Sequence, residues 1–226
     1  MKILVTGGLG YIGSHTIVKL LEKNFEVVCI DNLSNSSFSV KEKIKTITGK
    51  NFEFHQLDLR NDDTIKFIYD RHKRIDAIIH FAAKIYVPES IIYPIEYYHN
   101  NILSLLNITK VALGYECNLI FSSSCTVYGI PDKFPLDEKM PLAKSLSPYG
   151  NSKKICEELL IDLEQRSEIS ITSLRYFNPV GAHHSCLIGE RPIGEPVHLL
   201  PYITQVAIGK RQKLKIYGND YDTKDG

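Results

Sequence analysis

The residue pair best suited to proton transfer in this chain is Tyr149 and Lys153, which stand four positions apart in the segment YGNSK. On a helix, residues with this spacing lie on one face, one turn from each other. A lysine cation beside a phenol favours the phenolate and lowers a pKa that starts near 10. The spacing therefore predicts Tyr149 as a general base at neutral pH. The pattern is common, however, and an amphipathic pair on a helix surface has the same spacing.

A serine-rich segment, SSSCTVYG at residues 122–129, follows the short apolar run 119–121. If that run is a strand of an open parallel sheet, its serines stand at the carboxyl end, where such sheets bind ligands. Ser124 is then placed to hydrogen-bond the substrate oxygen that Tyr149 deprotonates. The presence of Ser124 therefore favours a catalytic role for the Tyr149 and Lys153 pair.

A glycine-rich turn, GGLGYIG at residues 7–13, follows the first apolar run and opens a helical pattern. Glycine permits a tight turn and a close approach to a pyrophosphate, and the helix N-terminus offers N–H groups to it. Asp31, at the end of the second strand, suits the hydroxyls of an adenosine ribose and would repel a 2′-phosphate, which favours NAD over NADP. Asp58 suits either the adenine amine or a cap for helix 62–72. The alternative is a plain strand–helix turn with a solvated aspartate.

These residues need a scaffold, and the hydrophobic pattern predicts one. Apolar runs alternate strictly with helical patterns, which indicates an α/β, Rossmann-type doubly wound parallel sheet. After Asn178 the periodicity weakens, so we predict an NAD-binding domain over 1–178 and the start of a substrate lobe over 179–226. The stretch 86–98, rich in Tyr and Ile, is expected to be buried packing and part of a helix docking surface. The predicted strands are 3–5, 27–30, 52–57, 77–81, 119–121, 171–175 and 214–217, and the predicted helices are 13–23, 38–48, 62–72, 95–114, 149–167 and 199–210.

Composition excludes several functional classes. The 226 residues carry 27 Lys and Arg against 26 Asp and Glu, so the chain has no strong field for nucleic acid or an acidic membrane surface. No apolar run approaches the roughly 20 residues of a membrane span. The five cysteines show no CxxC spacing, which suggests reduced thiols and a cytoplasmic protein. His183, His184 and Cys186 are too close in sequence for a tetrahedral metal site, and no metal site is predicted.

Taken together, the motifs resemble the extended short-chain dehydrogenase/reductase superfamily, and most closely its UDP-glucose 4-epimerases. The resemblance covers the whole chain and is most specific in the serine-rich loop and in GNDYDTKDG (218–226). The segments that carry it are TGGLGYIGSHT (6–16), DNLSNS (31–36), HFAA (80–83), YHNN (98–101), SSSCTVYG (122–129), SPYGNSK (147–153), LRYFNPVGAH (174–183) and 201–226.

The resemblance implies a reaction and a role for each matching residue. Tyr149 resembles the base for the sugar 4-hydroxyl, Ser124 its hydrogen-bonding partner, and Lys153 the residue that binds the nicotinamide ribose. NAD takes the C4 hydride and returns it to the other face of a transient 4-keto sugar. The implied cofactor contacts are Gly7, Gly10, Tyr11, Ile12, Gly13, Asp31, Asn32, Leu33, Ser34, Asn35, Ser36, Asp58, Leu59, Phe81, Ala82, Ala83, Lys84, Asn100, Ser122, Tyr149, Lys153 and Phe177. The implied substrate contacts are Ser124, Tyr149, Asn178, His198, Leu199 and Tyr217.

The chain departs from this family's pattern in three places. Lys84 stands one position early, with Ile85 at the usual lysine position, and His198 stands where an Asn usually contacts the nucleotide-sugar. The sequence also ends well before the family pattern does, so we expect much of the substrate-binding lobe to be missing.

Two alternatives and one partner expectation remain open. The first is another sugar-nucleotide enzyme of the same superfamily: a UDP-N-acetylglucosamine 4-epimerase, a decarboxylase or a dehydratase. The second is a fragment that binds NAD without turnover. The segment Ser124-Cys125-Thr126 offers no acid for removing water, which argues against a dehydratase. The resemblance also implies a homodimer through helices 95–114 and 149–167, and the first of these carries the apolar face Ile102, Leu105, Leu106, Ile108 and Thr109.

Overall fold

Strands and helices alternate along the chain in the computed structural model, which describes residues 1–131, 133–216 and 218–220. The strands are β1 (Lys2–Thr6), β2 (Glu26–Asp31), β3 (Glu53–Gln56), β4 (Ala77–His80), β5 (Asn118–Ser122) and β6 (Ile171–Leu174). The helices are α1 (Tyr11–Glu22), α2 (Ser39–Thr48), α3 (Asp62–Arg71), α4 (Val87–Ile92), α5 (Pro94–Gly114), α6 (Pro148–Glu164) and α7 (Leu199–Ala207), with a 3₁₀ turn at Cys125–Tyr128.

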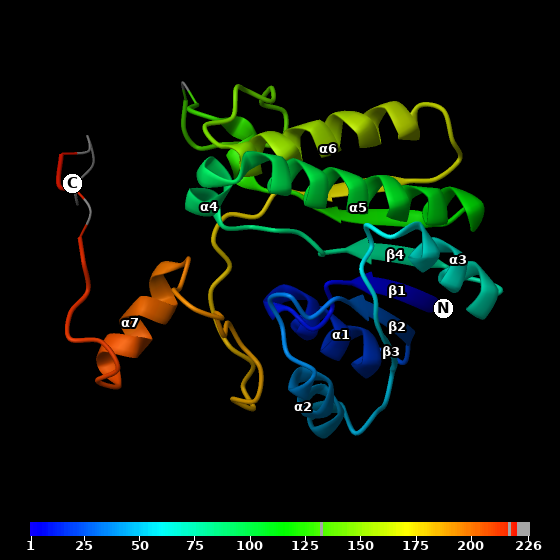
Figure 1. Cartoon of the computed structure of the whole chain (residues 1–226), viewed down its shortest axis with the longest axis horizontal. Coiled ribbons are helices and arrows are strands. Elements are labelled where there is room, and N and C mark those ends of the chain that lie inside the picture. Colours follow the sequence, from blue (N-terminus) through cyan, green and yellow to red (C-terminus); the bar gives the residue numbers. More distant parts are fainter. Residues whose placement is uncertain (132, 217, 221–226) are drawn as a thin grey trace. The chain divides into compact units, whose positions relative to one another are not determined.

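The six strands form one parallel sheet in the order β3-β2-β1-β4-β5-β6 (Figure 1). The order runs outward from β1 in both directions, so it reverses between β1 and β4. In doubly wound sheets this reversal opens a crevice at the carboxyl ends of the two strands, where ligands bind. The predicted Rossmann-type α/β fold is confirmed.

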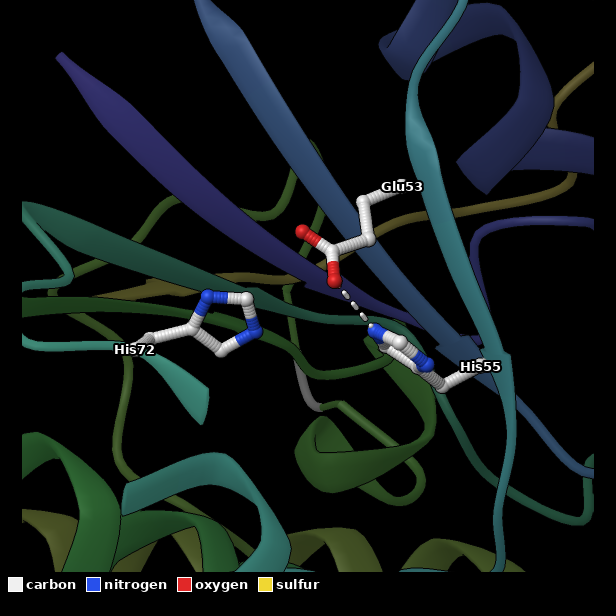
Figure 2. A group of neighbouring side chains, drawn as sticks. All are labelled: Glu53, His55 and His72. Carbon is white, nitrogen blue, oxygen red and sulfur yellow. Dashed lines mark hydrogen bonds and ion pairs between the residues drawn. The ribbon is translucent and has the colours of Figure 1, made fainter. Parts of the chain in front are cut away.

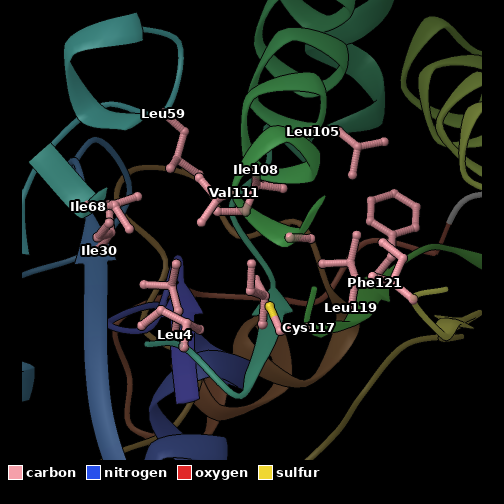
Figure 3. Close-up of a cluster of buried hydrophobic side chains, with 14 of the residues drawn as sticks. Leu4, Ile30, Leu59, Ile68, Leu105, Ile108, Val111, Cys117, Leu119 and Phe121 are labelled. Atoms are coloured by element: carbon pink, nitrogen blue, oxygen red, sulfur yellow. The ribbon is translucent and has the colours of Figure 1, made fainter. Parts of the chain in front are cut away.

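The alternation of side chains along the strands builds a core on each face of the sheet. On β1, Leu4 packs into one buried cluster, and its neighbours Ile3 and Val5 pack into the other. Figure 3 shows the first cluster, in which Leu4 meets Ile68 of α3 and Ile108 of α5. Because both faces are covered, the edge formed by the carboxyl ends of the strands is left for function.

Local signals explain where the site-bearing helix begins. Ser147 caps α6, its Oγ accepting a hydrogen bond from the Gly150 amide at 3.1 Å. Pro148 occupies the first turn of α6, where a missing N–H costs nothing. These two residues fix the start of the helix that carries Tyr149 and Lys153.

One predicted strand is absent from the described part of the chain, and one segment expected to be buried is buried only in part. The described residues of 214–217 form no strand. The stretch 86–98 is buried only in part: Tyr97 is fully buried, whereas Ile91 and Ile95 are 63% and 80% exposed. Hydrophobicity alone misled in both places, because a strand also needs a backbone partner and a helix buries only one face.

The chain divides into two compact units, Met1–Gly189 and Glu190–Gly226. The first holds the sheet and α1 to α6, and the second holds α7. The functional boundary expected after residue 178 stays a prediction. Within the described ranges, no helix combines the length and the apolar character needed to cross a membrane.

Candidate active site

The turn between β1 and α1 is built on backbone contacts that exclude side chains. Gly7 has φ +63°, and a Cβ added there would lie 2.7 Å from the Ala82 amide nitrogen, just beyond β4. A Cβ on Gly13 would lie 2.4 Å from the Gly7 carbonyl oxygen. Both distances are shorter than any real carbon contact, so only glycine fits at these two positions. The turn therefore presents bare backbone at the point where the strand order reverses.

The N-terminus of α1 faces this turn without a side-chain cap. Gly10 is the N-cap residue and supplies no side-chain acceptor to the first turn. The N–H groups of a first helical turn have no acceptor within the helix, and the helix dipole favours a negative charge beside them. Tyr11 begins the helix, and its hydroxyl donates to the Gly181 carbonyl at 2.6 Å. The turn fits a pyrophosphate, as dinucleotide cofactors require.

Asp31 ties the end of β2 to the glycine turn. Its buried carboxylate accepts hydrogen bonds from the Leu9 amide at 3.1 Å, the Leu33 amide at 2.9 Å and the Ser36 hydroxyl at 2.8 Å. A carboxylate has about four acceptor positions, so one remains for a further donor such as a ribose hydroxyl. Asn32, Ser34 and Asn35 follow in the same loop, with Ser34 and Asn35 exposed.

Asp58 is held by a neighbouring cation. Its carboxylate accepts from the Arg60 guanidinium at 2.6 and 2.9 Å and from the Asn32 amide group at 3.1 Å. The Arg60 hydrogen bonds hold the pKa of Asp58 well below its usual range, against the opposing effect of burial. The side chain does not cap α3, whose N-cap is Asn61, so that alternative is wrong. The neighbouring Leu59 side chain is buried in the core, which leaves its backbone for any contact with adenosine.

The end of β4 is locked to β1 and to α5. The Thr6 hydroxyl lies 2.7 Å from His80 Nδ1, and Phe81, Ala82 and Ala83 follow as partly buried residues. The Asn101 side chain accepts from the Lys84 amide at 2.8 Å and donates to the Lys84 carbonyl at 3.1 Å. Asn101 is thus a positioning residue, a role that the motifs did not predict. The predicted cofactor contact is its neighbour Asn100, whose side chain donates to Asn101 at 3.0 Å. The Lys84 ammonium pairs with Glu96 at 2.7 Å.

Lys153 is buried on α6 and points at the end of β5. Its side-chain nitrogen donates to the Ser122 carbonyl at 2.7 Å and lies over the Phe121 ring. Only 3% of the residue is exposed. Burial lowers the pKa of Lys153 to about 8, since the low-dielectric surroundings disfavour the ammonium.

Tyr149 and Ser124 meet as the sequence predicts, but the phenol is not activated by its neighbours alone. Tyr149 is 9% exposed. Burial raises its pKa, and its hydrogen bond with Ser124 opposes this only in part. The expected lowering of the Tyr149 pKa is therefore wrong for the free chain, because desolvation outweighs the hydrogen bond with Ser124. Ser124 is fixed in turn, its hydroxyl oxygen accepting from the Thr126 amide at 3.2 Å and the Thr126 hydroxyl at 3.0 Å.

A buried ionic network that no motif indicated supports this serine loop. The Arg175 guanidinium, which follows β6, donates to both carboxylate oxygens of Glu157 at 2.8 to 3.2 Å and to the Tyr128 hydroxyl at 3.0 Å. Ser123 donates to the same carboxylate. Glu157 stands four residues after Lys153, so the helical spacing alone was enough to place it on the lysine face.

The remaining expected contacts belong to the segment after β6 and to the second unit. Phe177 and Asn178 follow β6 and are exposed. In the second unit, the His198 ring nitrogen Nδ1 lies 2.5 Å from a Glu190 carboxylate oxygen, and Leu199 is 63% exposed. Tyr217 lies outside the described residues. The roles of these residues stay predictions.

Comparisons with known proteins identify the fold and chemistry. A model of the NAD dependent epimerase/dehydratase family matches residues 3–225. The chain belongs to this family. A UDP-glucose 4-epimerase of Yersinia enterocolitica is 51% identical over the whole chain, and one of Bacillus subtilis is 46% identical. The chain covers 68% and 67% of these relatives, so it spans about two thirds of their length.

Solved structures of the family agree with this assignment. The UDP-glucose 4-epimerase of Bifidobacterium longum, solved with NAD⁺ and UDP, is 43% identical to the chain with a TM-score of 0.94. That comparison covers all of this chain and 68% of the other. The enzyme of Stenotrophomonas maltophila, solved with NAD and formylated UDP-arabinopyranose, gives the same TM-score at 44% identity and covers all of this chain and 67% of the other. NAD is thus the cofactor of this family, in keeping with the glycine turn and Asp31.

The Glu157 network predicts a large loss of stability on a small change. Glu157→Gln keeps the shape but removes the charge, leaving the Arg175 guanidinium without its counter-ion. We expect a loss of about 3 kcal/mol in the free energy of unfolding, measured by urea denaturation. Glu158→Gln is the matched control, because Glu158 is exposed and lies 3.7 Å from Lys154, and we expect a change below about 0.5 kcal/mol. Equal stability of the two variants would contradict the network's role.

The Lys153 pKa predicts a pH-dependent stability. An amine with a pKa of about 8 in the folded chain and 10.5 when solvated releases its proton on folding. Stability therefore rises with pH through this range. Relative to Lys153→Met, wild-type stability without added nucleotide should increase by about 2 kcal/mol from pH 7 to pH 10. Lys154→Met is the control and should show no such gain. Parallel curves for the wild type and Lys153→Met would show that Lys153 is not desolvated.

Proposed function

We propose that this chain catalyses the interconversion of UDP-glucose and UDP-galactose, by transient oxidation of the sugar at C4 and return of the hydride to the opposite face. The observation that carries the proposal is the hydrogen bond between Tyr149 and Ser124 beside β5, whose last carbonyl binds Lys153, in a sheet whose glycine turn fits a dinucleotide. The relatives named above, UDP-glucose 4-epimerases of about 50% identity, support this choice of substrate.

Side chains of the protein itself transfer the proton of the sugar 4-hydroxyl. Tyr149 takes the proton of the sugar 4-hydroxyl, and Ser124 donates a hydrogen bond to the oxygen as its charge develops. When bound, oxidised NAD supplies the hydride acceptor for C4 and a positive charge that favours the Tyr149 phenolate. The buried Lys153 holds the end of β5 through the Ser122 carbonyl. With NAD bound, Lys153 would also bind the nicotinamide ribose. Because the reaction is redox-neutral overall, it consumes no external oxidant.

The composition of the serine loop separates this reaction from dehydration in the same superfamily. Loss of water needs an acid beside the leaving hydroxyl, and the loop offers Ser124, Cys125 and Thr126 there. Burial raises the pKa of the Cys125 thiol, so this residue is a poor proton donor at neutral pH. The chemistry of the loop thus favours epimerisation.

We also propose that two copies associate through α5 and α6 and that the enzyme works in the cytoplasm. These helices lie side by side on one face of the sheet (Figure 1). They expose large apolar side chains at Leu106, Leu113 and Ile161, each 40 to 49% accessible, while Leu105 and Ile108 face the core. All five cysteines are free thiols, as a reducing compartment maintains.

Tyr149→Phe tests the proposed reaction. Removal of the phenolic oxygen should reduce conversion of UDP-galactose to UDP-glucose at least about 100-fold, because no base remains for the 4-hydroxyl. Conversion is followed by chromatography of the nucleotide-sugars, and bound NAD is measured in the same sample. Tyr69→Phe is the matched control, since Tyr69 bonds the Lys110 carbonyl far from the site. Conversion by Tyr149→Phe within about twofold of the control would overturn the assignment.

Leu106→Glu tests the proposed dimer. A charge on the exposed face of α5 costs desolvation when that face is buried between two copies, so the variant should sediment as a monomer while the wild type sediments as a dimer. Phe38→Glu provides a control, because Phe38 is 48% exposed, against 40% for Leu106, but precedes α2. A monomeric wild type, or a variant that remains dimeric, would contradict the proposed interface.

A further inference from the structure

A group of metal-ligating side chains lies away from the cofactor edge, between the edge strand β3 and the end of α3. Glu53 and His55 are two positions apart on β3, so they share one face of the strand. His72 immediately follows α3, which runs back toward the start of the strands. Glu53 pairs with Val28 near the start of β2, whereas Asp31 of the cofactor site closes that strand. The group therefore stands apart from the glycine turn.

The three side chains converge on one point. Figure 2 shows the His55 and His72 rings on either side of the Glu53 carboxylate, and one ligand atom from each residue lies within 4.8 Å of the others. His55 Nε2 lies 2.8 Å from Glu53 Oε1. Ligand atoms on one tetrahedral metal with bonds of about 2.1 Å lie about 3.4 Å apart. Binding of one ion therefore requires the three side chains to adjust from a spread of up to 4.8 Å.

The chemistry of the two rings suits a metal of the zinc class. His72 is 3% exposed, and within the described ranges no hydrogen bond to either of its ring nitrogens is found. An imidazole ring nitrogen is a common ligand of such metals. The His55 ring meets Phe67 edge to face at 4.7 Å, which fixes its plane. Two imidazoles and one carboxylate, with a water as fourth ligand, are a recurrent zinc set.

Two cations oppose metal binding. The Arg71 Nε donates to Glu53 Oε1 at 2.5 Å, and the Lys2 ammonium also acts on His72. Burial raises the Glu53 pKa, but the hydrogen bonds from Arg71 and His55 outweigh it and keep the carboxylate ionised. Lys2 is paired with Glu26, and the Arg71 side chain is 55% exposed and free to turn into solvent. Arg71 thus pairs with the carboxylate oxygen that a metal ion would need and competes with the ion for it.

We propose that Glu53, His55 and His72 bind one divalent transition-metal ion of the zinc class, in competition with Arg71. The ion would join the end of α3 to the edge strand β3. It would stabilise that part of the sheet because it binds only the folded arrangement. The only sequence pattern with metal-ligating residues was His183, His184 and Cys186. The Glu53, His55 and His72 group gives no such pattern, because its members come from two separate elements.

The test is a titration of the metal-free chain with zinc chloride by calorimetry. The wild type should bind one ion at this site, and His55→Gln and His72→Gln should each lower the association constant at least about tenfold. Arg71→Gln should raise the constant severalfold, since it removes the competing cation. His99→Gln, at an exposed histidine on α5, is the matched control and should leave it unchanged.

Cobalt chloride then identifies the ligand types. Cobalt at this site should give visible bands of a nitrogen and oxygen set, without the sulfur charge-transfer band that the exposed Cys186 would give. Absence of zinc binding, unchanged affinity in His55→Gln, no gain in Arg71→Gln, or a thiolate band would each overturn the proposal. His55→Gln and Arg71→Gln alter partly exposed side chains, so the test stands even if the buried His72→Gln fails to fold.

Discussion

The cofactor edge depends on one steric constraint: the backbone approaches at Gly7 and Gly13 are so close that neither glycine tolerates a Cβ. Gly7 passes against the Ala82 backbone, and Gly13 passes against the Gly7 carbonyl. The first contact joins the ends of β1 and β4, where the strand order reverses, and the second brings α1 against the turn. The Asp31 carboxylate and the Thr6 hydroxyl secure the same region by hydrogen bonds. Backbone N–H groups are thereby presented to an anion in a fixed place.

Buried charged side chains hold the carboxyl ends of β5 and β6. Lys153 reaches the Ser122 carbonyl, and Glu157, one turn further on, joins Ser123 to Arg175. Each charge is costly to bury alone and is compensated by a neighbour at close range. These contacts hold the serine loop against α6, so that the Ser124 side chain hydrogen-bonds Tyr149. The same desolvation raises the Tyr149 pKa, which leaves activation of the phenol to the charge of a bound cofactor.

The order of elements and the Tyr149, Lys153 and Ser124 group were predictable from the sequence, because periodicity and short motifs reflect local geometry. The supports of the site were not. Asn101 clamps Lys84 from 17 residues away, and Arg175 reaches Glu157 across the sheet edge, and neither contact leaves a short-range pattern. Exposure along 86–98 and the Tyr149 pKa also depend on packing, which a residue pattern does not contain. His55 and His72 were missed for the same reason.

We expect the carboxyl edge of the sheet around Gly7 to hold NAD. The direct measurement is to denature the purified, folded chain with acid and to quantify the released dinucleotide by chromatography and absorbance. We expect close to one NAD per chain, retained through purification or regained on incubation with NAD. A folded chain that releases no dinucleotide, even after incubation with an excess of NAD, would contradict it.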